Sequence, residues 1–489
     1  MKDNSVLKFA IFIAGITFFL LYLFVIAQRL AYPYELEWLE GLSLQSVDRI
    51  LAGESLYVEP SFDFVSPIYT PLYFYVSASF ASIMGLGFAP LRLVSVIASI
   101  FSLLLVFAFI RKETNNSFYA FLGTSLFIAT YARSGAWLDL ARVDSLFLAL
   151  LLGAFFVAKF YNSPLSRIEL GILVSLAFLT KQTAIIMVAP LLLYLMYREK
   201  WRSLYFIVPI AIIIAGSALF MNNLTEGWYQ YYTFTLPSQH GFAPTVFYSF
   251  WLKDILLYVP LLALLALAYV SNKNANNRYF YAALLSGVLL GSWYAKLKLG
   301  GFVNNLIPSY AMLSIVAALA AYSMLQHLEF PRLLRGGFSS TLIYSLILLQ
   351  FIWFAYNPYS YIPSQEDWGA GNRIVAFVEN LKGDVLIPSH PYIASMAGKT
   401  AYAHFGPLYD VLIGADSKTS QDLKAEVISE ISSKKFEYII IDSDPDVEWF
   451  PEELEKSYML KETIPYKDRS TFRPKVSVQG RPELVYMPK

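Results

Sequence analysis

Two glutamates, three positions apart, follow the first long apolar segment of the chain. Glu37 and Glu40 lie within the segment 35–41, and on a helix they would share one face. Paired carboxylates at a membrane surface can bind a cation, or one can act as a general base whose pKa is raised by its neighbour. The residues alone support equally a second interpretation, in which the acids begin a solvated helix and are stabilised by its dipole.

Three further charged residues fall in or beside apolar segments, where charge is costly unless it is paired or faces water. Arg142 and Asp144 lie at a turn between two apolar runs, and an ion pair that orients this turn is the simpler interpretation. Lys181 lies on a hairpin too short to leave the membrane, beside Gln182 and Thr183. Its ammonium can extend to the membrane surface, but the polar neighbours favour binding of a lipid phosphate.

A basic loop that contains adjacent glycines follows further along the chain. Lys296 and Lys298 precede the glycine pair 300–301 and Asn304. Lysines on an outer loop run against the usual cytoplasmic bias, and adjacent glycines allow backbone to approach a ligand closely. Both features favour phosphate binding over a simple exposed turn. His240 is a lone histidine in another outer loop, where a polar loop residue is a commoner role than a ligand.

Several kinds of chemistry lack support in the sequence. The 489 residues include no cysteine, which excludes disulfides, thiol nucleophiles and cysteine metal sites. No H-E-x-x-H motif, G-x-S-x-G motif or histidine cluster indicates a zinc protease or a serine hydrolase. The formal net charge of +1 provides no field that would attract nucleic acid.

The elements that must position these residues are mainly membrane helices. The chain is 57% hydrophobic and only 15% charged, whereas a soluble domain carries about 25% charge. The aromatic content of 17% fits the aromatic belts found at membrane surfaces. Much of the surface is therefore expected to face lipid.

Short loops rich in Lys and Arg mark the cytoplasmic side and divide the chain into about eleven crossings. The first outer loop covers 28–67. Segment 71–87 is predicted to be a juxtamembrane helix, because a crossing there would place the basic pair 111–112 outside. The predicted crossings are 7–27, 91–110, 117–136, 143–160, two short helices between Arg167 and Arg198, 203–221, 250–270, 278–295, 303–323 and 338–356.

Residues 1–356 are thus predicted to form an all-α polytopic module with a cytoplasmic N-terminus. From about Asn357 the charge rises and the long apolar runs stop. Patterns of soluble structure follow, with helices at 371–381 and 423–431 and strands at 384–388 and 437–442. Residues 357–489 therefore predict a small α/β domain on the extracytoplasmic side.

Taken in order along residues 30–310, these motifs resemble the GT-C superfamily of polyprenyl-phosphate-dependent glycosyltransferases. The resemblance is to the branch of the protein O-mannosyltransferases and the lipid A aminoarabinose transferase. It rests on the acidic pair before Gly41, a helix and turn at 49–57, the segment 69–73, the Thr-Lys pair at 180–181 and the basic loop 296–305. Two departures stand out: Leu39 replaces an acid of the pair, and Ile68 to Thr70 lack the usual lysine.

The resemblance implies an inverting membrane glycosyltransferase in the plasma (inner) membrane. A carboxylate at Glu40 or Glu37 would deprotonate a hydroxyl acceptor, and the polyprenyl phosphate would leave, stabilised by Lys181 and Lys298. Asp144 would orient the acceptor or, with Glu37, hold a divalent cation such as Mg²⁺ or Mn²⁺. The other predicted substrate-binding residues are Arg142, Tyr69, Lys296, Asn304 and His240.

Two alternatives use the same charged residues without glycosyl transfer. The first is a transporter or flippase for a lipid-linked anionic substrate, although the two related halves that transporters often show are not evident. The second is a non-catalytic scaffold protein built on a degenerate module of this kind. Loss or retention of function at Glu37, Glu40 and Lys181 would separate these classes.

Overall fold

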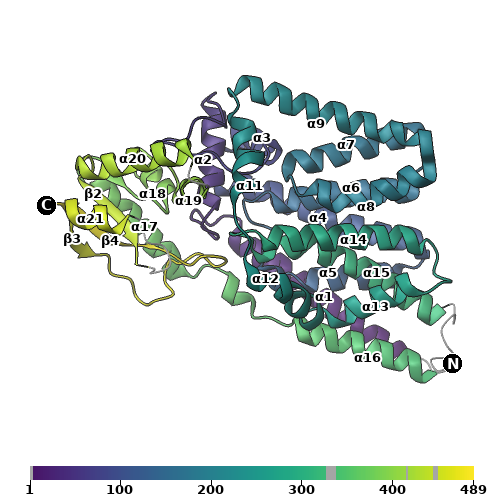
Figure 1. Cartoon of the computed structure of the whole chain (residues 1–489). Helices are drawn as coiled ribbons and strands as arrows, with labels where there is room; N and C mark the ends of the chain where they lie inside the picture. Colours follow the sequence, from purple (N-terminus) through teal and green to yellow (C-terminus); the bar gives the residue numbers. More distant parts are fainter. Residues whose placement is uncertain (1–3, 327–336, 415–416, 444–449) are drawn as a thin grey trace.

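The chain folds into a helical bundle and a smaller part that mixes helices with a sheet (Figure 1). The computed structural model describes residues 4–326, 337–414, 417–443 and 450–489. The mixed part is formed by the C-terminal residues and lies at one end of the bundle (Figure 1). The division predicted near Asn357 stays a prediction.

The predicted crossing 250–270 is broken by a 93° bend between Leu257 and Pro260, and every predicted crossing overlaps at least one helix of the bundle. These helices are α1 (Ser5–Arg29), α4 (Phe88–Thr114), α5 (Ser117–Ala129), α6 (Asp144–Phe160), α7 (Pro164–Thr180), α8 (Ala184–Glu199), α9 (Leu204–Leu224), α13 (Pro260–Ser271), α14 (Arg278–Leu297), α15 (Ile307–Gln326) and α16 (Gly337–Phe354). Within the described residues, five helical segments are long and apolar enough to span a membrane, or seven if two bent pairs each form one span. Eleven crossings therefore stay a prediction.

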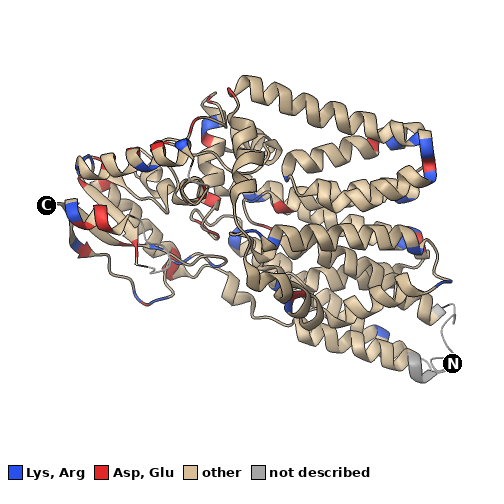
Figure 2. Cartoon of the chain, viewed as in Figure 1, with Lys and Arg blue, Asp and Glu red and all other residues tan. Residues whose placement is uncertain are grey.

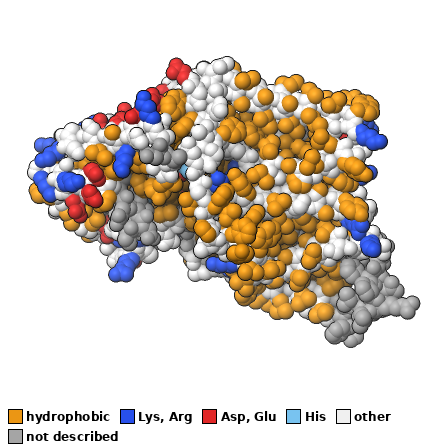
Figure 3. Space-filling model, viewed as in Figure 1, with side chains coloured by type: hydrophobic (Ala, Val, Ile, Leu, Met, Phe, Trp, Pro, Cys, Tyr) orange, Lys and Arg blue, Asp and Glu red, His pale blue; other side chains and the backbone are white. Residues whose placement is uncertain are grey.

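The surface of the bundle is that of a multi-pass membrane protein. Apolar side chains cover most of its visible face, whereas the C-terminal part carries many charged groups (Figure 3). Lys and Arg gather in the turns at the end of the bundle far from the C-terminal part (Figure 2). Two partly buried ion pairs lie among these turns, Arg167 with Glu199 and Lys159 with Glu113.

The hairpin around Lys181 has the predicted form. Ser163 begins α7 with a capping box, and Pro164 occupies the first helical position, where a missing N–H costs nothing. Lys181 is the C-cap of α7, and α8 starts three residues later at Ala184. Two short helices therefore place Lys181 at their junction.

The connection between α1 and α4 contains two helices, α2 (Glu40–Leu51) and α3 (Leu72–Met84). Helix α3 coincides with the predicted juxtamembrane segment 71–87. The shorter connecting helices of the chain are η1 (Ala132–Ser134), η2 (Lys200–Ser203), α10 (Trp228–Gln230), η3 (Tyr231–Thr235), α11 (Leu236–Gln239), α12 (Pro244–Ser249), η4 (Phe250–Leu257), η5 (Val303–Leu306) and η7 (Pro358–Tyr361).

The C-terminal part contains a four-stranded mixed sheet in the order β1-β2-β4-β3. Strand β1 pairs parallel to β2, and the other two pairings are antiparallel. Its elements are α17 (Gln365–Asn380), β1 (Val385–Leu386), α18 (Pro391–Met396), α19 (Phe405–Leu412), α20 (Lys418–Ser432), β2 (Tyr438–Asp442), α21 (Pro451–Ser457), β3 (Tyr458–Thr463) and β4 (Pro482–Pro488). The predicted helices and strands are confirmed. Strand β3 escaped prediction because it is an exposed edge strand without an apolar pattern.

Candidate active site

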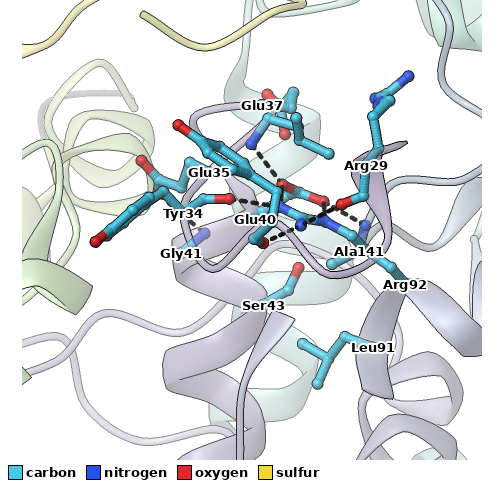
Figure 4. Close-up of polar contacts among 12 residues, drawn as sticks. Arg29, Tyr34, Glu35, Glu37, Glu40, Gly41, Ser43, Leu91, Arg92 and Ala141 are labelled. Carbon is cyan, nitrogen blue, oxygen red and sulfur yellow. Dashed lines mark hydrogen bonds and ion pairs between the residues drawn. The ribbon is translucent and has the colours of Figure 1, made fainter. Parts of the chain in front are cut away.

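Glu40 lies at the centre of a fully buried ion pair (Figure 4). The Arg92 guanidinium donates to both of its carboxylate oxygens, from Nε to Oε1 at 3.0 Å and from Nη2 to Oε2 at 2.6 Å. The backbone N–H groups of Leu36 and Ala141 also donate to these oxygens, each at 2.7 Å. Burial alone would raise the pKa of Glu40, but Arg92 and the two backbone donors hold it below its usual value.

Arg92 ties this carboxylate to the end of the first helix. Its remaining N–H groups donate to the carbonyl oxygens of Arg29, Tyr32 and Tyr34, at 3.1, 2.5 and 2.6 Å. The residue lies in the first turn of α4, inside a predicted crossing, and the sequence analysis did not single it out. A charge inside an apolar segment needs a partner. The position of Arg92 in the apolar segment 91–110 was therefore the sign in the sequence that it forms a buried ion pair.

A second buried ion pair, between Arg29 and Asp139, is linked to the first because the Arg29 carbonyl oxygen accepts from Arg92. Arg29 Nε lies 3.2 Å from Asp139 Oδ2, and Tyr131 bridges the two residues. The Tyr131 hydroxyl accepts from Arg29 Nη1 at 2.6 Å and donates to Asp139 Oδ1 at 2.6 Å. Like Arg92, these residues were missed by the sequence analysis, because their partners are far apart in the chain.

Glu37 has looser contacts than Glu40. Its Oε2 lies 3.3 Å from Arg142 Nη1 and accepts the Leu39 backbone N–H at 3.2 Å. Arg142 also donates to the Tyr69 hydroxyl at 3.2 Å. Burial raises the pKa of Glu37 to about 7, and the charge of Arg142 only partly opposes this shift. The structure thus brings together three residues that were predicted as a site, with a carboxylate that titrates near neutral pH.

Asp144 and Lys181 form a third buried pair. Lys181 Nζ donates to Asp144 Oδ1 at 2.7 Å and to Asn305 Oδ1 at 2.9 Å. The Asn304 amide donates to the same Asp144 oxygen at 3.0 Å. The void beside these residues has no room for a water molecule. The predicted lipid-phosphate seat at Lys181 is therefore closed, and its positive charge is already matched by a carboxylate.

The basic loop separates into two environments. Lys296 forms an ion pair with Asp254, away from the other predicted residues. Lys298 has no carboxylate partner among the described residues, and its Nζ donates to the carbonyl oxygen of His240 at 3.1 Å. The imidazole Nε2 of His240 in turn lies 3.1 Å from the carbonyl oxygen of Asp410, near the end of α19. The structure thus joins Lys298 and His240 to the C-terminal part.

The glycine pair 300–301 serves the fold of this loop rather than an approach to a ligand. Gly300 has a φ of 80°, a conformation that favours glycine. A Cβ on Gly301 would lie 2.5 Å from the carbonyl oxygens of both Ala295 and Lys296, at the end of α14. We predicted that these glycines let the backbone approach a ligand. In the structure they let the chain turn back and pack closely against the end of α14.

The substitution Gly301→Ala is expected to destabilise the protein by about 1–3 kcal/mol, because the added methyl group must displace backbone atoms. Thermal unfolding in detergent would measure this. The matched control is Gly216→Ala in α9, where a Cβ meets no atom within 4 Å. Equal melting temperatures for the two variants would contradict the close approach.

The residues predicted to hold a divalent cation do not fit one. No group of three or more His, Cys, Asp or Glu side chains within the described residues is arranged to hold a metal ion. Glu37 is paired with a guanidinium and Asp144 with an ammonium group. Because each carboxylate already faces a cation, neither is available as a metal ligand in this arrangement.

Comparison with known proteins supports the fold. Residues 67–225, about a third of the chain, match the family described as dolichyl-phosphate-mannose-protein mannosyltransferase. No curated protein matches the chain significantly by sequence.

The most similar solved structures include ArnT from Cupriavidus metallidurans, in the apo state and bound to undecaprenyl phosphate. The apo structure matches with a TM-score of 0.62 at 13% identity, and the bound structure with 0.61 at 12%. Both alignments cover 96% of this chain and 97% of ArnT.

The oligosaccharyltransferase of Archaeoglobus fulgidus, solved with Zn and sulfate, matches with a TM-score of 0.52 at 11% identity. That alignment covers 88% of this chain and 67% of the other. Its matched segment and its architecture show that the chain has the GT-C fold.

Proposed function

We propose that the chain transfers a sugar from a polyprenyl-phosphate carrier to a hydroxyl acceptor on the extracytoplasmic face, with inversion at the anomeric carbon. The observation that carries this proposal is the pair formed by Glu37 and Arg142, in which a buried carboxylate titrates near neutral pH. The match of the whole chain to ArnT, which was solved with undecaprenyl phosphate, supports the choice of donor.

Glu37 is the general base in this proposal. Its carboxylate accepts the proton of the acceptor hydroxyl, and the hydroxyl oxygen forms a bond to the anomeric carbon. The bond from that carbon to the phosphate oxygen breaks, and its electron pair leaves with the polyprenyl phosphate. A base works best when its pKa lies near the working pH. Glu40 does not meet this condition, because hydrogen bonds from Arg92 and from two backbone N–H groups hold its pKa below the usual value.

Lys298 stabilises the leaving phosphate. Lys181 and Lys296 each face a carboxylate, so their charge is largely compensated. Lys298 is held by the carbonyl oxygen of His240 and keeps its charge available. A cation placed where negative charge develops stabilises the transition state. Lys181 then serves mainly to orient Asp144 at the start of α6.

The test uses purified full-length protein and a panel of undecaprenyl-phosphate sugars labelled in the sugar. Wild-type protein is expected to release the label from at least one donor. Lys298→Ala should lower kcat/KM for that donor by about 10- to 100-fold, the value of a hydrogen bond to a charged group. Lys253→Ala removes an exposed lysine of η4 and should leave kcat/KM unchanged.

Two results would overturn the proposal. The absence of turnover with every donor, combined with saturable donor binding that Lys298→Ala weakens, would indicate a carrier-binding protein or transporter. Turnover with an unchanged kcat/KM in Lys298→Ala would mean that another cation stabilises the leaving phosphate.

A further inference from the structure

The C-terminal part of the chain contacts the backbone on both sides of Glu37. The carbonyl oxygen of Leu36 accepts the backbone N–H of Val476 at 3.1 Å. The carbonyl oxygen of Trp38 lies 2.9 Å from Nε2 of His404, at the N-terminus of α19. The carbonyl groups of the residues before and after the proposed base are thus held by groups more than three hundred residues away in the sequence.

The tautomer of His404 follows from its two contacts. Its Nδ1 accepts the backbone N–H of Gly406 at 2.9 Å and so caps α19. Nε2 must then carry the proton and donate it to Trp38. Burial lowers the pKa of His404 to about 3, which keeps the imidazole neutral at physiological pH. The contact to Trp38 is therefore a constant feature of the folded protein.

His390 holds the same loop through a side chain. Its Nδ1 lies 2.5 Å from Glu35 Oε2, and its Nε2 lies 3.3 Å from Asp442 Oδ1 at the end of β2. All three side chains are buried. Burial alone would lower the pKa of His390, but its two acidic neighbours outweigh this effect and raise the pKa. A single imidazole therefore links two acidic side chains from distant parts of the chain.

Glu35 transmits this contact to the start of α2. Its Oε1 accepts the backbone N–H of Gly41 at 3.0 Å, one residue after Glu40. A Cβ on Gly41 would lie 2.2 Å from that carboxylate oxygen. A Cβ on Gly406 would lie 2.5 Å from the Leu39 side chain. Gly41 thus leaves room for the Glu35 carboxylate within the loop, and Gly406 leaves room for the loop against the C-terminal part.

We propose that His390 and His404 are positioning residues, which make the C-terminal part a structural component of the active site by fixing the loop that carries Glu37. This inference rests on the proposed function, since it assigns Glu37 a catalytic role. The acceptor or the carrier need not touch either histidine. Misplacement of a reacting group by about 1 Å can lower the rate by about 100-fold.

The first test compares two amide replacements of His390. An asparagine amide nitrogen overlays Nδ1 of histidine and can still donate to Glu35. A glutamine amide nitrogen overlays Nε2 and can donate only toward Asp442. His390→Asn is therefore expected to keep a kcat within about threefold of wild type, whereas His390→Gln should lower kcat at least tenfold. The KM for the donor should not change in either variant.

The second test uses His404→Asn. Asparagine is a favourable N-cap residue and preserves the hydrogen bond to Gly406, but it is too short to reach the Trp38 carbonyl. A kcat at least tenfold lower is expected, with a wild-type KM and only a small fall in melting temperature, because the Trp38 carbonyl loses its donor. Arg373→Gln is the matched control, because it breaks an exposed ion pair in the same part of the chain.

The outcomes separate this inference from the proposed function. If wild-type protein turns over no donor, the proposed function fails before the variants are compared. If wild-type protein is active and folded His390→Gln and His404→Asn retain its kcat, only the positioning inference is overturned. A parallel fall of kcat and melting temperature in all three histidine variants, His390→Asn included, would also overturn it, because this would indicate general destabilisation.

Discussion

The substitution Glu37→Gln is expected to lower kcat by about 10²- to 10⁴-fold, the usual contribution of a general base. Glutamine has nearly the same shape and can still contact Arg142, so the melting temperature and the KM for the donor should change little. Glu40→Gln is the informative comparison, because it removes one charge of a buried pair and should lower stability together with activity. Equal activity of Glu37→Gln and wild-type protein would refute the assignment.

The pH dependence of kcat gives a second view of the same residue. The base must be deprotonated, and the pKa of Glu37 is raised to about 7. The rate should therefore fall about tenfold per pH unit below that value and reach a plateau above it. The value of kcat should be measured from about pH 5 to pH 8, the range that contains the expected fall. A flat profile through this range would mean that another group accepts the proton.

The substitution Arg92→Met is expected to destabilise the protein by about 3–5 kcal/mol, the cost of breaking a buried ion pair by removing one partner. The change leaves the Glu40 carboxylate buried without a counter-charge and three carbonyl oxygens without their donor. Denaturant or thermal unfolding in detergent measures the effect.

Two controls accompany this variant. Arg49→Met breaks a more exposed ion pair with Glu54 in the same loop and should cost at most about 1 kcal/mol. The double variant Arg92→Met with Glu40→Gln should be less destabilised than Arg92→Met alone, because the buried charge is then absent. Additive losses in the double variant would show that the pair itself contributes little.

The sequence was sufficient to predict elements whose signals are local. The apolar runs marked the helices of the bundle, and the length between Arg167 and Arg198 predicted the short hairpin with Lys181 at its junction. The glutamates and Arg142 were recognised because charge is rare in such surroundings. In each of these cases the prediction needed only residues that lie close together in the sequence.

Partners distant in the sequence were beyond this reasoning. Nothing in the residues around Glu40 indicates Arg92, and nothing near Glu35 indicates His390 or Asp442, since these contacts arise only when separate elements pack together. The roles of the two glutamates depend on those partners. The sequence therefore identified the acidic pair, whereas the distinction between Glu37 and Glu40 required the fold.

The hydrogen bonds from His404 and Val476 to the loop around Glu37 also bear on how the protein is made. The loop is synthesised more than three hundred residues before the groups that fix it. A nascent or truncated chain that ends before these groups can insert its helices and still lack a finished loop around Glu37. If the proposed function holds, such partial products would remain in the membrane without consuming the lipid-linked donor.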